Sequence, residues 1–158
     1  MFSDDSMQPL YHKNSKILIL GSFPSVKSRE YNFYYAHPHN RFWPILEHLY
    51  HEPLSTQEQC LAFLKKHDIA LWNVVQYCDI HGSSDSSIKN IVVQPIEELI
   101  AITNIQTIYT NGKKAHELYM KYCYEKTQIK DICLPSTSSA NAAWSLEKLI
   151  DTWKVIQA

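Results

Sequence analysis

Residues 16–25, with the sequence KILILGSFPS, indicate both the fold class and the position of a binding site. Its first half is a short aliphatic run, which is typical of a strand buried on both faces of a parallel sheet. Its second half changes at once to glycine, hydroxyl and proline residues. Open parallel sheets bind their ligands beyond the carboxyl ends of the strands, so we expect a binding site to begin at Gly21.

Three more short apolar runs predict strands at residues 69–75, 107–110 and 129–134. Ser55 and Glu58 have the S-x-x-E spacing of a capping box and predict the start of a helix there. Strands that alternate with helices favour parallel pairing with helices on both faces. The sequence therefore predicts an α/β fold, a three-layer α/β/α sandwich with a central four-stranded parallel sheet. The predicted helices cover residues 42–50, 56–66, 96–102, 113–125 and 145–156.

The composition predicts one domain over residues 1–158 and excludes few functions. The net charge is -1 and the pI about 6.7, so no global positive field indicates a nucleic-acid partner. Four cysteines without Cys-x-x-Cys spacing predict free thiols, no metal and no iron-sulfur cluster. No apolar run reaches the ~18 residues of a membrane span, and we expect a cytoplasmic protein. The polar segment 79–87 is typical of a mobile loop.

Each predicted strand ends in residues that offer amides, hydroxyls or glycine. Because the carboxyl ends of parallel strands meet at one edge of the sheet, we expect these groups to form one site. Of the three glycines in the chain, Gly21 and Gly112 directly follow strands. The strand-end segments are residues 21–25, Asn73, residues 111–114 and residues 135–139.

Several of these segments together resemble one known family. The matching motifs are GSFPS (21–25), YYAHPHNRFW (34–43), WNVV (72–75), CDIHGSSD (78–85), NGKKA (111–115) and LPSTS (134–138). In this order, over roughly residues 16–154, they are similar to the uracil-DNA glycosylase superfamily, and most similar to its hypoxanthine-DNA glycosylase branch and mismatch-specific relatives.

The resemblance implies a monofunctional DNA glycosylase that acts on double-stranded DNA as a monomer and without a cofactor. Such an enzyme flips a deaminated base out of the helix and hydrolyses its bond to deoxyribose. The resemblance places the catalytic residue at Asn40, whose amide would orient the attacking water. The alternative for Asn40 is a structural one, because asparagine is also a good N-cap for a helix that begins near Arg41.

The chain departs from the family pattern at several positions. Phe23 stands where sister branches position water with a carboxylate or an amide, and a phenyl ring cannot do so. Leu134 stands where sister branches carry a histidine that stabilises the departing base. Four further positions differ from what members of the branch usually carry: Ser25 in place of glycine, His39 of arginine, Asn73 of aspartate and Ser139 of proline. Catalysis is therefore expected to depend on other groups.

Asn73 is the candidate for reading the base. Its amide offers an N–H donor beside a C=O acceptor, and this pair complements the lactam edge of hypoxanthine or uracil. Adenine and cytosine present amino donors there, so a fixed amide would reject them. The alternative is a strand-end asparagine that satisfies loop backbone groups.

The other candidates divide between the base and the DNA backbone. Gly21 and Ser22 would present backbone N–H groups to the base, and Phe23 and Tyr35, with Tyr34 beside them, would stack on it unless they belong to the core. The DNA contacts are expected from hydroxyls, amides and cations in the matched loops. These residues are His37, His39, Asn111, Lys113, Ser136, Thr137, Ser138 and Ser139.

Two alternative functions remain open at this stage. A uracil or thymine mismatch glycosylase fits the same motifs, because the Asn73 amide does not distinguish hypoxanthine from uracil. A non-catalytic nucleic-acid-binding domain fits the loss of a polar residue at Phe23. His37 and His39 flank Pro38, but no third ligand with suitable spacing accompanies them, so a metal site is disfavoured.

Overall fold

The computed structural model describes residues 2–4, 7–79 and 89–157. Its main sheet has four parallel strands in the order β3-β2-β6-β7, which confirms the predicted sheet. β2 lies inside the sheet because its aliphatic run can be buried on both faces, and Leu18, Ile19 and Leu20 are 0% exposed. The strands are β2 (Ile17–Gly21), β3 (Ile69–Asn73), β6 (Thr107–Asn111) and β7 (Ile132–Leu134).

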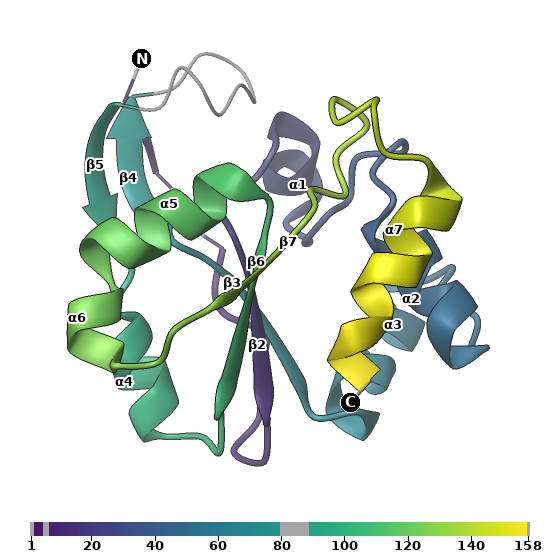
Figure 1. Cartoon of the computed structure of the whole chain (residues 1–158), viewed down its shortest axis with the longest axis horizontal. Coiled ribbons are helices and arrows are strands. Elements are labelled where there is room, and N and C mark those ends of the chain that lie inside the picture. The colour runs from purple at the N-terminus through teal and green to yellow at the C-terminus, as the bar shows by residue number, and fades with distance from the viewer. Residues whose placement is uncertain (1, 5–6, 80–88, 158) are drawn as a thin grey trace.

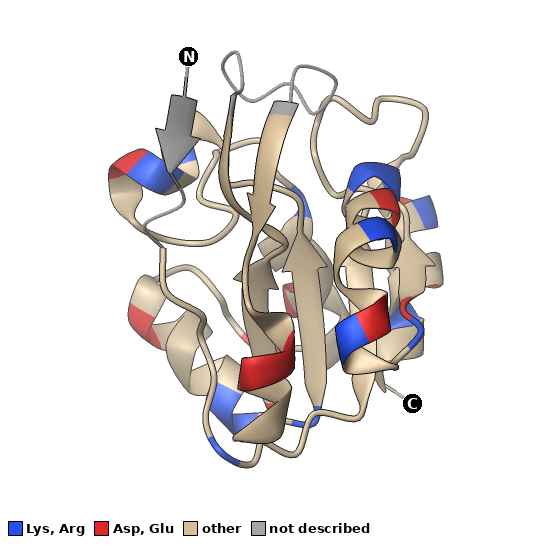
Figure 2. Ribbon diagram, turned by 90° about the vertical axis from the view of Figure 1, so that its left-hand side faces the viewer, with Lys and Arg blue, Asp and Glu red and all other residues tan. Residues whose placement is uncertain are grey.

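Helices cover both faces of this sheet, and the predicted three layers are confirmed (Figure 1). The strands of the main sheet carry no charged residue, whereas the helices that cover it carry many (Figure 2). One face is covered by α4 (Ile96–Ala101), α5 (Lys113–Tyr122) and α6 (Tyr124–Thr127). The other is covered by α2 (Phe42–Tyr50), α3 (Gln57–Lys66) and α7 (Leu146–Trp153), which continues as a 3-10 turn over Lys154–Gln157.

Two helix starts differ from the prediction. The capping box of α3 lies one residue later than expected, because the Thr56 hydroxyl accepts from the Gln59 N–H and the Gln59 side chain accepts from the Thr56 N–H, both at 3.1 Å. The short helix α1 (Val26–Tyr31) was not predicted. It begins because the Ser25 hydroxyl accepts a hydrogen bond from the Ser28 N–H at 3.0 Å.

A second, antiparallel sheet was also not predicted. It has the order β1-β4-β5 and consists of β1 (Phe2–Asp4), β4 (Val75–Asp79) and β5 (Lys89–Val93). The prediction of one strand over residues 69–75 is wrong at its end, because the chain leaves the main sheet after Asn73. No turn residue marks the crossing, and residues 69–75 are buried throughout. Of the predicted mobile loop over residues 79–87, Asp79 is the last residue of β4, and the rest lies outside the described residues.

The helices within the described ranges are all too short or too polar to cross a membrane. The four cysteines are free thiols, as predicted, and three of them are buried. The core lies between the sheet and its helices, and its largest fully buried side chains include Trp153, Tyr119 and Phe42. The carboxyl ends of the four main strands extend from this packed core to one edge of the sheet, and the candidate site lies at that edge.

Candidate functional site

A cavity of about 120 Å³ lies at the carboxyl edge of the main sheet. It receives side chains from the ends of β2, β3 and β6 and from the loop that follows β7. The strand-end residues therefore converge on one cavity, as predicted. The sequence-predicted residues that line this cavity are Gly21, Ser22, Phe23, Tyr35, Asn40, Asn73, Asn111, Ser136, Thr137 and Ser138.

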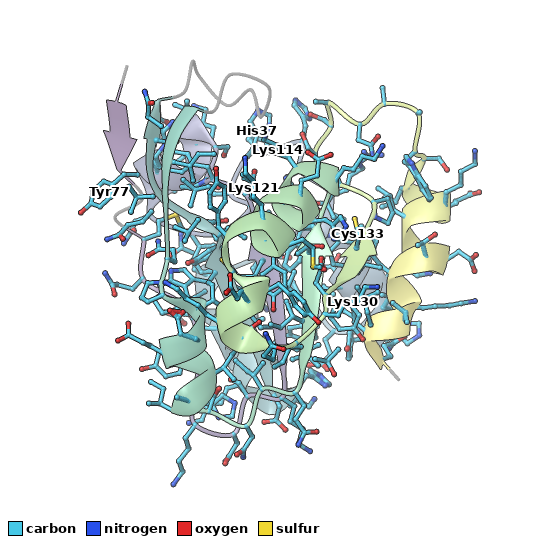
Figure 3. The ribbon with its side chains drawn as sticks, turned by 60° about the vertical axis from the view of Figure 1, so that its left-hand side comes forward. His37, Tyr77, Lys114, Lys121, Lys130 and Cys133 are labelled. Atoms are coloured by element: carbon cyan, nitrogen blue, oxygen red, sulfur yellow. The ribbon has the colours of Figure 1, made fainter. Side chains whose placement is uncertain are left out.

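A wider groove of about 1080 Å³ adjoins the cavity. The predicted DNA-contacting residues His37, Lys113 and Ser139 line this groove, as does Lys114 at the start of α5. Figure 3 shows the side chains of His37, Lys114 and Cys133, which come from three different segments. His39 lines neither hollow, and its N–H donates to Nδ1 of His37 at 3.1 Å.

Gly21 and Asn73 are direct partners across the β2–β3 ladder. A Cβ atom on Gly21 would lie 2.6 Å from Oδ1 of Asn73 and 3.3 Å from the hydroxyl of Tyr35. Asn73 itself is 3% exposed. The absence of a side chain at position 21 leaves room for Oδ1 of Asn73 and the hydroxyl of Tyr35 beside it, and we call this part of the cavity its floor.

Tyr35 places a buried hydroxyl at this floor. Its ring stacks on Phe42 with the centroids 4.1 Å apart, and its backbone has a positive φ of 55°, which is uncommon for an aromatic residue. Burial raises the pKa of Tyr35 to about 12, an effect that the nearby Asn111 amide opposes in part. The hydroxyl makes no hydrogen bond of normal geometry to the described residues, so its contact with Asn111 is a weak one and the oxygen can also bond to a ligand.

Phe23 and Tyr34 contribute differently to the wall. Phe23 is half-buried, and the guanidinium carbon of Arg29 lies 5.2 Å from its ring centroid. Tyr34 is 3% exposed, and its hydroxyl donates to the Gln8 carbonyl at 2.8 Å. Tyr34 is therefore anchored in the core, whereas Phe23 and Tyr35 have surface to offer to a base.

Asn40 lies one residue before Arg41, the N-cap of α2, and its Oδ1 accepts from the Phe42 N–H at 2.9 Å. The predicted N-cap at Asn40 is therefore wrong by one residue, although the side chain does bond to the first N–H of the helix. The same oxygen also accepts from the Thr137 hydroxyl at 2.8 Å. Asn40 lines both the cavity and the groove.

Sequence reasoning assigned no role to Arg41, yet this residue organises the loop after β7. Its side chain donates to the carbonyls of Thr137, Ser138, Asn141 and Trp144, with Nη2 to Ser138 at 2.8 Å. One signal in the sequence was available: a cation at a helix N-terminus opposes the helix dipole and so indicates another partner.

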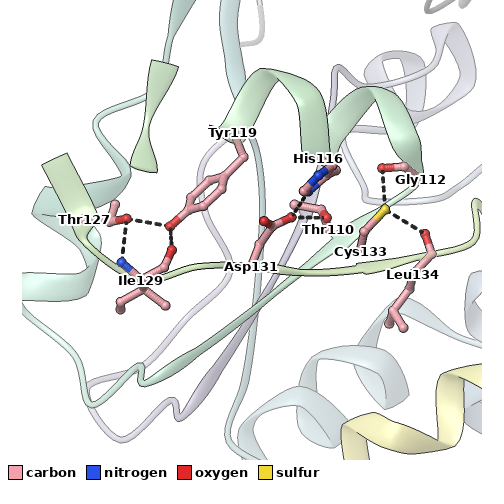
Figure 4. Close-up of polar contacts among 9 residues, drawn as sticks. All are labelled: Thr110, Gly112, His116, Tyr119, Thr127, Ile129, Asp131, Cys133 and Leu134. Carbon is pink, nitrogen blue, oxygen red and sulfur yellow. Dashed lines mark hydrogen bonds and ion pairs between the residues drawn. The ribbon is translucent and has the colours of Figure 1, made fainter. Parts of the chain in front are cut away.

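A buried polar cluster lies behind the groove, under α5 (Figure 4). Oδ2 of Asp131 accepts from the Thr110 hydroxyl at 2.5 Å and pairs with Nδ1 of His116 at 2.8 Å. The Asp131 side chain is 0% exposed. These bonds tie α5 to β6 and to the segment that enters β7, and so hold the start of α5 against the groove. No group of three or more His, Cys, Asp or Glu side chains in the described ranges is arranged to hold a metal ion.

Polar strand ends of a parallel sheet thus enclose a small cavity, and a groove that includes Lys113 and Lys114 adjoins it, which is where ligands bind in open α/β sheets. The family model of the uracil DNA glycosylase superfamily matches residues 8–157, and the chain belongs to this superfamily.

Two curated relatives are hypoxanthine DNA glycosylases from Methanosarcina species. The one from Methanosarcina acetivorans is 34% identical over 138 residues, which is 84% of this chain and 85% of the relative. The one from Methanosarcina barkeri is 34% identical over 112 residues, 69% of this chain and 71% of the relative. The solution NMR structure of a candidate uracil DNA glycosylase from Methanosarcina acetivorans superposes with a TM-score of 0.80 at 28% identity, and each chain is covered completely. The predictions of the family, the fold and the enzyme class, a DNA glycosylase, are confirmed.

Proposed function

We propose that this enzyme removes hypoxanthine from deoxyinosine in double-stranded DNA, with the base flipped into the cavity and the backbone held in the groove. The main support for the proposal is that the cavity opens into the groove. Ser25, Asn40, Ser136 and Ser138 line both of them and therefore frame the passage between them.

The size of the cavity supports a base as its occupant. Pockets for drug-sized ligands span roughly 300–1,000 Å³. A cavity of about 120 Å³ is smaller than this and suits one nucleobase without its sugar. The sugar and phosphates then remain in the groove, and the bond between the base and C1′ lies in the passage beside Asn40.

Asn73 supports a base with a lactam edge. Its nearly complete burial and its place opposite Gly21 restrict the side chain, so the amide presents one fixed pattern to a bound base. Hypoxanthine and uracil both match this pattern, and the 34% identity to two hypoxanthine DNA glycosylases favours hypoxanthine. We expect Phe23 and Tyr35 to provide the aromatic surface against which the base stacks.

The groove supports DNA as the polymer. Lys113 and Lys114 begin α5 directly after Gly112, so a phosphate there would meet two cations and the N-terminus of a ten-residue helix. The hydroxyls of Ser136, Ser138 and Ser139 are of the type that contacts phosphate oxygens. These groups form a local binding surface although the net charge of the chain is -1.

The experiment measures base release from duplex oligonucleotides that contain deoxyinosine, deoxyuridine or a T·G mismatch. We expect cleavable abasic sites to form fastest with deoxyinosine. Asn73→Ala should abolish the preference and most of the activity, whereas Asn104→Ala, an exposed amide that precedes β6 at the other end of the sheet, should match the wild type. Faster release of uracil or thymine would replace the proposed substrate, and binding without release of any base would indicate a non-catalytic domain.

A further inference from the structure

Three side chains from separate segments form a chain of hydrogen bonds that ends at the passage. Asn111 is the last residue of β6, Thr137 lies in the loop after β7, and Asn40 precedes α2. Nδ2 of Asn111 lies 3.0 Å from Oγ1 of Thr137, which lies 2.8 Å from Oδ1 of Asn40. Thr137 is 1% exposed, so water does not compete for these bonds.

Backbone N–H groups determine the direction of this chain at both ends. The N–H of Thr137 donates to Oδ1 of Asn111 at 3.0 Å, so the other end of that amide, Nδ2, must donate to the Thr137 hydroxyl. The hydroxyl has one proton, and it donates that proton to Oδ1 of Asn40. The same oxygen accepts the Phe42 N–H, which confirms from the other end that it is an oxygen.

The orientation of Asn40 has a chemical consequence. A carbonyl oxygen has two lone pairs, and both lone pairs of Oδ1 already accept protons. The remaining end of the amide is Nδ2, which can only donate. An N–H donor can hold a water molecule through one of its two lone pairs, but it cannot accept a proton from that water and so does not activate it for attack on C1′.

We propose that Asn40 acts as a hydrogen-bond donor to the departing base, and that Thr137 and Asn111 are positioning residues that hold it in this orientation. The inference rests on the proposed function, which places the glycosidic bond beside Asn40. In hypoxanthine the acceptor next to this bond is N3, and in uracil it is O2.

The donor acts while the bond between C1′ and the base nitrogen breaks. The bonding pair leaves with the base, and its negative charge is stabilised by the Nδ2 donor. The oxygen of a water molecule then bonds to C1′ and loses a proton to solvent, and the base takes up a proton. The sum is one water consumed, one neutral base released and one hydroxyl formed at C1′.

The decisive substitution is Asn40→Asp, because it keeps the oxygen that accepts from Phe42 and Thr137 and replaces the donor by an anionic oxygen. We expect single-turnover release of hypoxanthine to fall on the order of 10²-fold or more, at least as far as with Asn40→Ala. Protonation of the new carboxyl restores a donor, so the rate of Asn40→Asp should rise as the pH is lowered from 8 toward about 5. An Asn40→Asp enzyme as fast as the wild type would overturn the inference, because a carboxylate serves a water-activating role better than an amide.

The positioning residues are tested by Thr137→Val, which removes the hydroxyl at nearly constant volume. We expect the rate of base release to fall about tenfold or more with the DNA dissociation constant unchanged, and Thr137→Ser to restore most of the rate. Asn111→Asp is a second route, since it still accepts from the Thr137 N–H but cannot donate to the hydroxyl. Thr107→Val, at the opposite end of β6, is the matched control.

The proposed function and the positioning role of Thr137 would be contradicted by different results. A wild-type enzyme that releases no base from any substrate overturns the proposed function and this inference together. An active wild type whose Thr137→Val and Thr137→Ser variants are equally impaired, or whose loss lies only in DNA affinity, overturns the positioning role alone. Thermal unfolding of every variant shows whether a lost rate reflects a lost fold.

Discussion

The side-chain oxygen of Asn73 lies 2.6 Å from the position that a Cβ atom on Gly21 would occupy. The two residues are cross-strand partners at the carboxyl ends of β2 and β3. The base-reading amide proposed above therefore occupies space that any other residue at position 21 would fill. This contact relates a sequence feature, a glycine at a strand end, to the shape of the cavity.

Gly21→Ala should reduce base release on the order of 10²-fold, because the new methyl group displaces Asn73 and the Tyr35 hydroxyl by a fraction of an ångström or more. The fold should survive, since the atoms displaced are side-chain ends. Gly112→Ala offers the contrast: φ at Gly112 is 101°, so alanine strains the backbone there and should lower the free energy of unfolding by about 1 kcal/mol or more. Kinetics and urea unfolding of both variants check this difference, and a fully active Gly21→Ala enzyme would contradict it.

Tyr35→Phe should stabilise the protein while it slows base release. The hydroxyl is buried and makes no hydrogen bond of normal geometry to the described residues, and removing such a group relieves a desolvation cost of about 1–3 kcal/mol. The ring that stacks on Phe42 remains. Urea unfolding and single-turnover kinetics measure the two effects, and a variant that is less stable than the wild type would show that the hydroxyl has a partner in the folded protein.

Stability should fall at alkaline pH, between about 10 and 12. Burial raises the pKa of both Tyr35 and Tyr119 to about 12, from the ordinary tyrosine value of 10.0. The folded state therefore holds protons that the unfolded state loses, so the stabilisation is complete below pH 10 and is lost as the pH rises toward 12. Unfolding free energies across this range should decline less steeply in Tyr35→Phe, and identical slopes would argue against a buried phenol at position 35.

Arg41→Met should loosen the loop after β7. Four backbone carbonyls lose their charged donor. Because Arg41 is only half-buried, water can replace part of these bonds, and we expect a loss of about 2 kcal/mol in stability and a weaker affinity for DNA. Arg41→Lys should be intermediate because lysine lacks the planar fork. Urea unfolding and fluorescence anisotropy with labelled duplex test this. Unchanged DNA affinity would show that the loop does not contact DNA.

His116→Ala should destabilise the fold more than Asp131→Asn. The first leaves a fully buried carboxylate whose remaining bond is to Thr110, whereas the second removes the buried charge and keeps an acceptor. Leaving a buried acceptor without one of its hydrogen-bond partners costs about 1–3 kcal/mol, and we expect about 2 kcal/mol for His116→Ala. The reverse order in urea unfolding would contradict this prediction.

Much of the site was predictable because its residues directly follow strands with a clear apolar pattern. Asn73, Asn111 and the loop after β7 could be assigned to one edge of the sheet from the alternation of strands and helices alone. The passage from β3 to β4 could not, because the apolar run continues through Val74 and Val75 without a turn residue. Arg41 was missed because its partners are backbone carbonyls about 100 residues away. Every residue has such a carbonyl, so no pattern of side chains marks these four.

Val74 lies between the end of β3 and the start of β4 and is hydrogen-bonded in two directions. Its N–H donates to the Gly21 carbonyl at 2.8 Å, and its own carbonyl accepts from the Gln94 N–H at 2.8 Å. The chain therefore passes from one sheet to the other without a linker, and the residue next to Asn73 is held by bonds in two directions. The conformational entropy of this position is lost when the protein folds, so a ligand in the cavity would not have to order it.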